Sequence, residues 1–382
     1  MSDTSRAQLA YAPESTFAAQ VTGANLQILN YTGEGLKQNS SFTRSGSIRS
    51  DRQVPSVRRS RFETAGSVNF ELLFGGHEDL IAAALQSAGW SSPVTVSGTT
   101  IAAVASGNKY TDSGNGFGSI VVGQWVKVSG FVNAANNGLR KVTAAAAGEI
   151  TVSGAALVDE AAGQSVTVVQ GAQIVNGTTL VTYNLERSYT DLSQELALYL
   201  GQAVNGFSMD VPEEGPVTCV LDFIGAQEQS LDSSGGTGYT AAVEGEIFTG
   251  GDLTSLLENQ ASMGILGVNF RLNNNLRTRK EAGPSGVISI GSGTIELTGA
   301  LRAYYSDSTF YDKYLNETAT SIAVALTDPD GNIYLVDMPQ VKITDGQRVV
   351  SGPNGDTIAD VQFEAYRDSS EDTTIRLAKF AA

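Results

Sequence analysis

Residues 44–73 read RSGSIRSDRQVPSVRRSRFETAGSVNFELL, and two patterns meet in this stretch. The part from Arg44 to Arg61 holds six arginines and a single carboxylate, Asp51. The part after it alternates, with apolar side chains at every second position: Val68, Phe70 and Leu72. Alternation with a period of two is typical of a strand that buries one face. The sequence therefore predicts a half-buried strand that the chain enters from a basic loop.

The basic loop contrasts with the charge of the whole chain. Its arginines are Arg44, Arg49, Arg52, Arg58, Arg59 and Arg61. The 382-residue chain has a formal net charge of −16, and residues 177–382 hold 28 acidic and 12 basic groups. Because binding to phosphates needs a surplus of Lys and Arg, a surface of this composition repels a polyanion.

Three interpretations of the basic loop compete: a solvated mobile loop, a nucleic-acid site, or a contact with an acidic surface on another copy of the chain. We favour the last, because the loop lacks aromatic stacking partners for bases and arginine pairs well with carboxylates. Complementary charge on two faces of one molecule gives a heterologous contact, which builds rings or filaments. A second basic stretch, Arg277, Arg279 and Lys280, is assigned to the same kind of contact.

Residues 91–176 differ in composition from the rest of the chain. They are dense in Val, Thr, Ser, Ala and Gly, and short alternating runs such as QWVKVSGF and EITVSG are separated by turns. Short strands at this spacing predict a small all-β sandwich or barrel. Its Ser/Gly-rich edges indicate a module that is inserted into a surface loop of a host fold.

The segments on either side of this module resemble each other. Phe42 precedes Gly66 by nearly the same interval as Phe270 precedes Gly293, with a basic loop between the members of each pair. A helical pattern follows each segment, HEDLIAAALQSAG and DSTFYDKYLNETA. We predict an internal duplication of a strand–loop–strand–helix unit. The alternative is that strand followed by helix recurs in any α+β protein.

The sequence holds little that could carry catalysis. Its one histidine, His77, begins a predicted helix and is expected to be a satisfied surface residue. Its one cysteine, Cys219, lies in an apolar run and is expected to be a buried structural thiol. G-x-S-x-G elbows and phosphate loops are absent, and the DPDG at 328–331 predicts a turn. We therefore expect no enzyme, no metal and no cofactor.

No run of residues approaches the length of an apolar membrane span, and the N-terminus lacks the pattern of a signal peptide. Synthesis and assembly in the cytosol are the expectation.

Four stretches together resemble the major tail tube protein of bacteriophages with long, non-contractile tails. They are LAYAPESTF, residues 44–85, GQWVKVSGFVNAANNGLRKVTA and LGQAVNGFSMDVPEEGPVTCVLDFIG. The resemblance implies a mainly β fold of tail-tube sandwich or barrel units with short flanking helices. It also implies rings closed by the sheets of neighbouring subunits, and stacking of the rings guided by the loop from Arg44 to Gly66.

The resemblance, combined with the duplication, gives a domain organisation. Residues 1–90 form a first tube unit, residues 91–176 an Ig-like surface module, and residues 177–382 a second unit that completes the fold. Family rings are often hexameric with one unit per subunit, so two units per chain imply a trimer that acts as a pseudo-hexamer.

The resemblance also implies a structural protein of the virion tail that is assembled in the host bacterial cytoplasm. Its implied partners are other copies of itself and the tape-measure, tail-terminator and distal tail proteins. DNA would pass through the lumen without specific binding. The alternative function is a β-rich adhesin or carbohydrate-binding protein that uses residues 91–176 for recognition.

Overall fold

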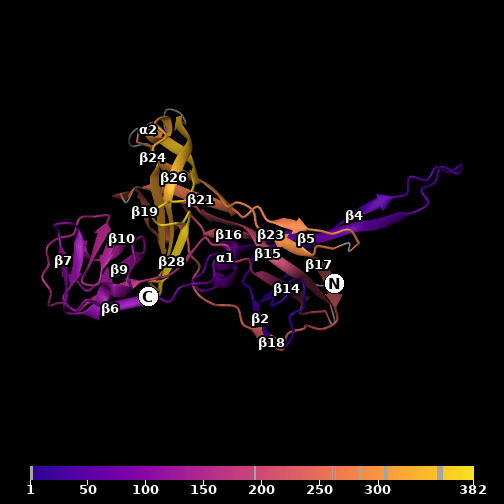
Figure 1. The fold of residues 1–382 in the computed structure, drawn as a ribbon, viewed down its shortest axis with the longest axis horizontal. Helices are drawn as coiled ribbons and strands as arrows, with labels where there is room; N and C mark the ends of the chain where they lie inside the picture. Colours follow the sequence, from indigo (N-terminus) through magenta and orange to yellow (C-terminus); the bar gives the residue numbers. More distant parts are fainter. Residues whose placement is uncertain are drawn as a thin grey trace.

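The structure is a computed structural model, and it is mainly β, as the sequence predicts (Figure 1). It describes residues 3–192, 195–259, 261–262, 264–283, 286–304, 309–350 and 356–382. No helix in these ranges has the length and apolar character needed to cross a bilayer.

The first part of the main sheet comes from residues on both sides of the predicted module. Its elements are β1 (Ala7–Pro13), β2 (Asn25–Ile28), β3 (Gly33–Glu34), β4 (Lys37–Arg44), β5 (Val57–Glu71), α1 (Glu78–Ala84), β13 (Ala172–Val175), β14 (Thr182–Tyr189), β15 (Leu196–Val211), β16 (Thr218–Gly225), β17 (Gln227–Leu231) and β18 (Gly238–Thr240).

The second part follows along the chain. Its elements are β19 (Leu253–Glu258), β20 (Ala261–Ser262), β21 (Ile265–Asn273), β22 (Arg277–Arg279), β23 (Ser289–Gly291), β24 (Glu296–Tyr304), α2 (Thr309–Leu315), β25 (Thr320–Thr327), β26 (Ile333–Val350), β27 (Thr357–Ala365) and β28 (Arg376–Phe380). The strands β22 and β23 pair as a separate small hairpin.

Residues between α1 and β13 form a separate seven-stranded sheet in the order β6-β12-β9-β10-β11-β8-β7. Its strands are β6 (Val94–Gly98), β7 (Ile101–Val104), β8 (Lys109–Asp112), β9 (Trp125–Ser129), β10 (Gly138–Ala146), β11 (Glu149–Ser153) and β12 (Val166–Gln170). It encloses a core of its own that includes Tyr110, Phe117 and Val128. We call residues 94–170 the module; it lies at the opposite end of the molecule from the β4–β5 hairpin (Figure 1).

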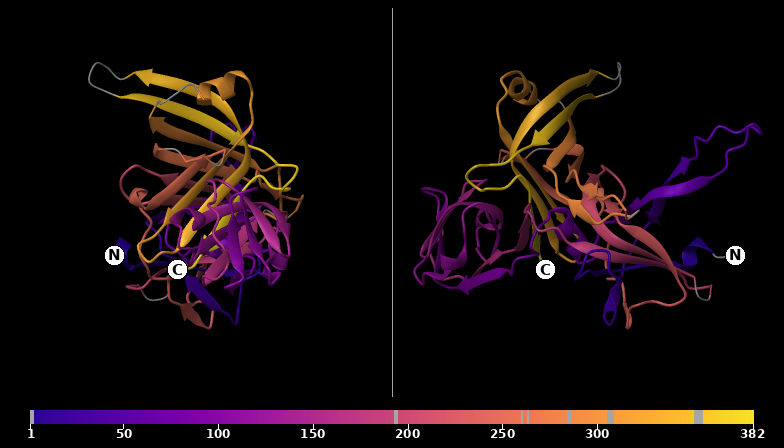
Figure 2. Two further views of the ribbon diagram at one scale, coloured as in Figure 1. Left: turned by 90° about the vertical axis from the view of Figure 1, so that its left-hand side faces the viewer. Right: turned by 45° about the vertical axis from the view of Figure 1, so that its right-hand side comes forward.

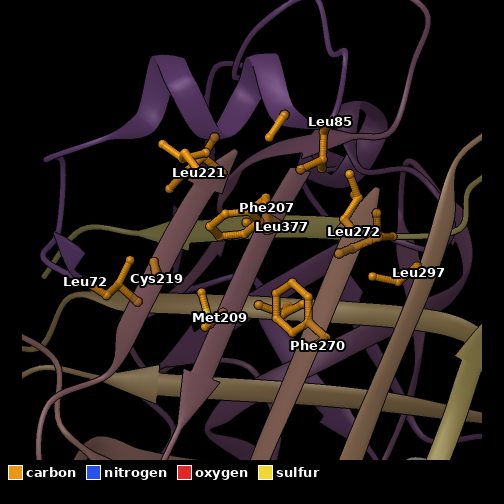
Figure 3. Close-up of a cluster of buried hydrophobic side chains, with 14 of the residues drawn as sticks. Leu72, Leu85, Phe207, Met209, Cys219, Leu221, Phe270, Leu272, Leu297 and Leu377 are labelled. Carbon is orange, nitrogen blue, oxygen red and sulfur yellow. The ribbon is translucent and has the colours of Figure 1, made fainter. Parts of the chain in front are cut away.

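Eight antiparallel strands form a continuous curved ladder in the order β4-β5-β16-β15-β21-β24-β27-β26. One face of the ladder is apolar and packs against α1 and the residue that follows it, with Leu80, Ile81 and Leu85 buried. Figure 3 shows this core beneath the helix. The predicted strand is confirmed, because Val68 and Phe70 are almost fully buried.

The same succession of strand pairings occurs twice along the chain. The first is β1–β14–β15–β16–β5–β4, with β17 also on β15. The second is β19–β25–β26–β27–β24–β21, with β28 also on β26. Each helix follows the equivalent strand, since α1 comes after β5 and α2 after β24. Strand order, pairing and helix position thus recur together.

The irregularities of the two successions coincide as well. The β14–β15 pair shifts register at Asn184 and the β25–β26 pair at Ser321. The β15–β16 pair shifts at Asn205 and the β26–β27 pair at Thr344. A bulge is a specific local feature of a strand pair, so its recurrence fixes which residues are equivalent.

This equivalence corrects the predicted one. Gly66 pairs with Phe223 and Gly299 pairs with Phe363, so Gly66 corresponds to Gly299 rather than to Gly293. Phe270 then corresponds to Leu36 rather than to Phe42. The predicted equivalence was displaced by six residues, because it matched single Phe and Gly residues along the sequence, whereas equivalence is set by strand pairing.

Glycine is required at both equivalent positions. A Cβ on Gly66 would meet the backbone oxygen of Gly35, and a Cβ on Gly299 would meet the backbone oxygen of Asn269. The neighbouring strand therefore approaches closely at the same place in each succession, which only a residue without a side chain allows.

Candidate functional site

The strands β4 and β5 extend from the body as a two-stranded arm, which we define as residues 37–65 (Figures 1 and 2). Lys37 to Arg44 pair with Ala65 to Val57, and residues 45–56 form the tip. Most side chains of the outer part are exposed because no other element lies beside it. The predicted basic loop is therefore the outer half of a long hairpin.

All six arginines of the predicted loop lie on this arm. Arg44 ends β4, Arg49 and Arg52 lie in the tip with Asp51, and the other three, Arg58, Arg59 and Arg61, are on β5. Arg49 Nε donates to both carboxylate oxygens of Asp51, at 3.0 and 3.1 Å. This pairing lowers the pKa of Asp51 and raises the pKa of Arg49. In the same turn Arg52 has a left-handed φ of 60°, and its N–H donates to the Arg49 carbonyl oxygen at 3.3 Å.

The remaining arginines keep most of the positive charge of the arm available. Arg59 stacks over the ring of Phe62 at 4.7 Å. For Arg44, Arg52 and Arg58, no carboxylate partner lies in the part of the chain that the structure describes. A cationic surface without its own counter-charges is suited to bind an acidic surface elsewhere.

The arm also exposes apolar side chains, which sequence analysis did not identify. The exposed fractions are 63% for Phe42, 101% for Ile48, 53% for Val54 and 57% for Val57. Single exposed apolar residues are ordinary, but four on one slender hairpin leave it with an unusual amount of apolar side chain in contact with solvent. In the sequence, Ile48, Val54 and Val57 stand among the arginines of the loop, and this pattern could have indicated them.

The second basic stretch lies at the base of the arm. Lys280 Nζ lies 2.7 Å from Glu63 Oε2 on β5, and the Thr278 hydroxyl donates to the same oxygen at 2.7 Å. The hydrogen bond from Lys280 lowers the pKa of Glu63. Arg277 and Arg279 lie on the β22 strand of the hairpin that braces this base. The structure thus brings the two predicted basic stretches together.

An acidic turn lies at the other end of the same strands. Glu71, the last residue of β5, pairs with Thr218, the first residue of β16. The turn before β16 carries Glu213 and Glu214, both exposed. Because β5 has 15 residues, the arm tip and this turn lie at ends of a strand that is about 50 Å long. The two ends of β5 therefore differ in charge: the arm is cationic, and the turn beside Glu71 is anionic.

His77 is buried rather than exposed, which corrects the prediction for it. Its ring stacks on Phe70 with centroids 3.8 Å apart, and Nε2 lies 2.7 Å from the Asn30 carbonyl oxygen. Burial lowers the pKa of His77 to about 4, so the ring is neutral near pH 7. It packs in the core that α1 covers, a long-range contact that its position in the sequence did not reveal.

Cys219 is buried, as predicted, and burial raises the pKa of its thiol far above the ordinary value. A buried protonated thiol is a poor nucleophile. Within the described residues, no group of three His, Cys, Asp or Glu side chains is placed to hold a metal ion.

A buried polar cluster joins the module to the main sheet. Trp125 Nε1 donates to Asp337 Oδ2 at 3.0 Å, and Lys141 Nζ lies 2.9 Å from the same oxygen and 2.7 Å from Glu371 Oε1. Arg376 completes the cluster at 2.6 Å from Glu371 Oε2. Around it Trp125 packs on apolar residues of β25, β26 and β28. Sequence analysis missed this junction, because its members lie far apart along the chain.

Comparison with known proteins identifies the family of the chain. No match was found among curated protein sequences. The model of a family described as phage tail tube protein matches residues 4–365. The match spans the arm, the module and every strand of the two successions except β28. The chain therefore belongs to the phage tail tube protein family.

Proposed function

We propose that three copies of this chain close into a ring and that the rings stack into the tail tube through which DNA leaves the virion. The family to which the chain belongs is one of structural phage tail proteins and is not an enzyme family. The observation that carries the proposal is the recurrence of the strand pairings, bulges included. One chain supplies two tube units, so three chains make a pseudo-hexameric ring.

The two units are fused into one sheet, which supports ring formation. The strand β15 of the first succession pairs with β21 of the second over Gly206–Val211. The ladder thus passes from one unit into the next without a break. A closed ring of such ladders has no exposed strand edges.

Stacking of the rings uses the two ends of the ladder. The arm, with Arg44, Arg49, Arg52, Arg58, Arg59, Arg61 and the bracing residues Arg277, Arg279 and Lys280, contacts the acidic turn of a copy in the next ring. The support is their placement at opposite ends of β5. A heterologous contact of this kind propagates along an axis and forms a filament.

The face of the ladder away from the core lines the lumen. Its residues are mostly polar and uncharged or acidic, and they include Ser208, Asp210, Thr218, Asn269, Thr298, Gln362 and Glu364. One cation, Arg271, lies among them, and it pairs with Asp222 at 2.8 Å. Such a wall offers few cations to phosphates, so DNA slides past it. The tape-measure protein is the expected partner in this lumen, and terminator and distal tail proteins are the expected partners at the tube ends.

The domain organisation of the proposal keeps residues 91–176 as the middle segment. The first tube unit comprises residues 1–90 together with β14 to β17, and the second unit begins at β19. The middle segment forms an Ig-like module on the outer surface, and assembly takes place in the host bacterial cytoplasm.

Electron microscopy of the purified protein tests the proposal. Stacked rings with threefold symmetry are expected. Monodisperse monomers that bind glycans would instead favour an adhesin, and sixfold rings of single units would contradict the duplication.

A further inference from the structure

Two strand edges of the ladder have no strand paired with them in the described part of the chain; at Gln38 of β4, β17 makes only side-chain contacts through Glu228. One is the edge of β26 beyond Val341, where β25 ends and β27 occupies only the opposite side. The other is the edge of β3 and β4 that faces away from β5. An open edge presents unpaired N–H and C=O groups and pairs readily with another chain.

The first succession shows what covers the edge that is equivalent to the open one on β26. The strand β15 corresponds to β26, and beyond its own bulge it pairs with β21. Gly206 lies opposite Asn273, and Val211 lies opposite Val268. The joint between the two units of one chain is therefore a template for a joint between two chains.

Because the bulges coincide in the two successions, they identify which residues of the open edges are equivalent to the paired residues of β15 and β21. Asp345 follows the bulge at Thr344 as Gly206 follows the bulge at Asn205. On the partner edge, the equivalence of Gly66 with Gly299 makes Leu36 the counterpart of Phe270. On this basis, Asn39 is the counterpart of Asn273.

We propose that Asp345–Val350 of one copy pairs antiparallel with Glu34–Asn39 of a second copy, with Asp345 opposite Asn39 and Val350 opposite Glu34. This inference rests on the proposed ring and specifies the strands and the register that close it.

Hydrogen-bond geometry on the acceptor edge fits the pairing. The Gly35 N–H bonds to Ser67 O on β5, so the N–H groups of Leu36 and Gln38 point the other way. In the single chain these two are capped by carboxylates, Leu36 by Glu34 at 2.8 Å and Gln38 by Glu228 at 3.1 Å. Their counterparts, Phe270 and Leu272, face β15. In the ring, backbone carbonyl groups of β26 accept hydrogen bonds from the Leu36 and Gln38 N–H groups in place of the Glu34 and Glu228 carboxylates.

Charge at the joint is complementary. The proposed register places Lys37 opposite Gln347 and diagonal to Asp345 on the same face of the sheet. Lys37 is exposed in the single chain, and Asp345 is partly exposed. Diagonal neighbours of opposite charge lie within reach of a long side chain and stabilise a strand pair.

Cysteine cross-linking tests the register. Asp345 and Asn39 would form a pair without mutual hydrogen bonds, whose Cα atoms lie about 4.5 Å apart, close enough for a disulfide. The double variant Asp345→Cys/Asn39→Cys is assembled under reducing conditions and then oxidised. Cys219 is buried and does not compete. The expected product on a non-reducing gel is a covalent trimer in high yield.

The matched control is Asp345→Cys/Ser41→Cys, which moves one thiol by two residues along the same face of β4. We expect at least a tenfold lower yield of trimer from it. If normal rings form but the Ser41 variant cross-links as well as the Asn39 variant, or better, the register is wrong while the ring stands. If the wild-type protein forms no rings, the proposed function itself fails.

A mixture of the two single variants, Asp345→Cys and Asn39→Cys, keeps the test informative if the double variant misfolds. On a non-reducing gel each variant alone should run as a monomer, and the mixture should give a covalent dimer. Absence of that dimer in a mixture that forms rings would overturn the inference.

Discussion

Lys141 of the module and Asp337 of β26 form an ion pair of 2.9 Å, with 7% and 0% of their side chains exposed. Asp337 also accepts a hydrogen bond from Trp125 and lies 3.3 Å from Arg376. Two cations and two carboxylates are thus enclosed where the module meets the main sheet. The module is anchored by a buried polar contact and is not a loosely tethered appendage.

Lys141→Ala should destabilise the whole chain. The change removes one of the two cations that offset the charge of the buried Asp337 carboxylate. Loss of one partner of a buried pair costs about 3 to 5 kcal/mol of unfolding free energy. Chemical denaturation measures the free energy of unfolding. The matched control is Lys127→Ala, a change on the neighbouring strand of the module. Equal stability of the two variants would show that the buried cluster does not hold the junction.

Gly66→Ala and Gly299→Ala should each destabilise the protein by about 1 to 3 kcal/mol, the usual range for overpacking. In both cases the new Cβ would meet the backbone of the adjacent strand. Gly46→Ala in the arm tip is the control, because nothing lies within 4 Å of its added Cβ. Thermal unfolding distinguishes them. A neutral effect at either Gly66 or Gly299 would contradict the close approach that the two successions share.

Stability should fall as the pH drops from about 6.5 to about 4, in part because of His77. Burial lowers its pKa to about 4 in the folded state, whereas the unfolded chain takes up a proton near pH 6.5. The unfolded state therefore binds more protons within this window, and the linkage amounts to about 3 kcal/mol. His77→Gln should flatten the pH profile relative to wild type, since carboxylates contribute equally to both proteins. Parallel profiles would mean that His77 titrates normally.

Reversal of charge at Arg58, Arg59 and Arg61 to Glu should stop tube growth but leave the protomer folded. These side chains lie on the arm outside the main core, and repulsion would replace attraction at the acidic turn. Tube length is measured by negative-stain microscopy and folding by circular dichroism. Addition of Glu213→Lys and Glu214→Lys should restore growth. Tubes of normal length in the arm variant, or no rescue by the second pair, would contradict docking between these surfaces.

The local parts of the fold were predictable from the sequence, and the long-range parts were not. The burial of Val68 and Phe70 followed from a period of two, which depends only on neighbouring residues. The helix after them was predicted to run to Gly89 but ends at Ala84, where the chain turns toward the module. Capping and tertiary contacts set helix ends, so periodicity locates them poorly.

The candidate site shows the same division. Charge counting found the arginines of the arm and the excess of acid in the second half. It did not place Glu213 at the far end of the strand that carries Arg61, because that relationship depends on the pairing of β5 with β16. The stack of His77 on Phe70 and the ion pair of Lys141 with Asp337 likewise join segments whose contact no local pattern encodes.

The mass and symmetry of a single ring test the central claim most directly. If each chain supplies two tube units, native mass spectrometry of isolated rings should give three times the 39.9 kDa chain mass. Averaged end-on images should then show threefold symmetry with six similar lobes. A ring of six chains, or a threefold ring whose lobes have no pairwise likeness, would contradict the account.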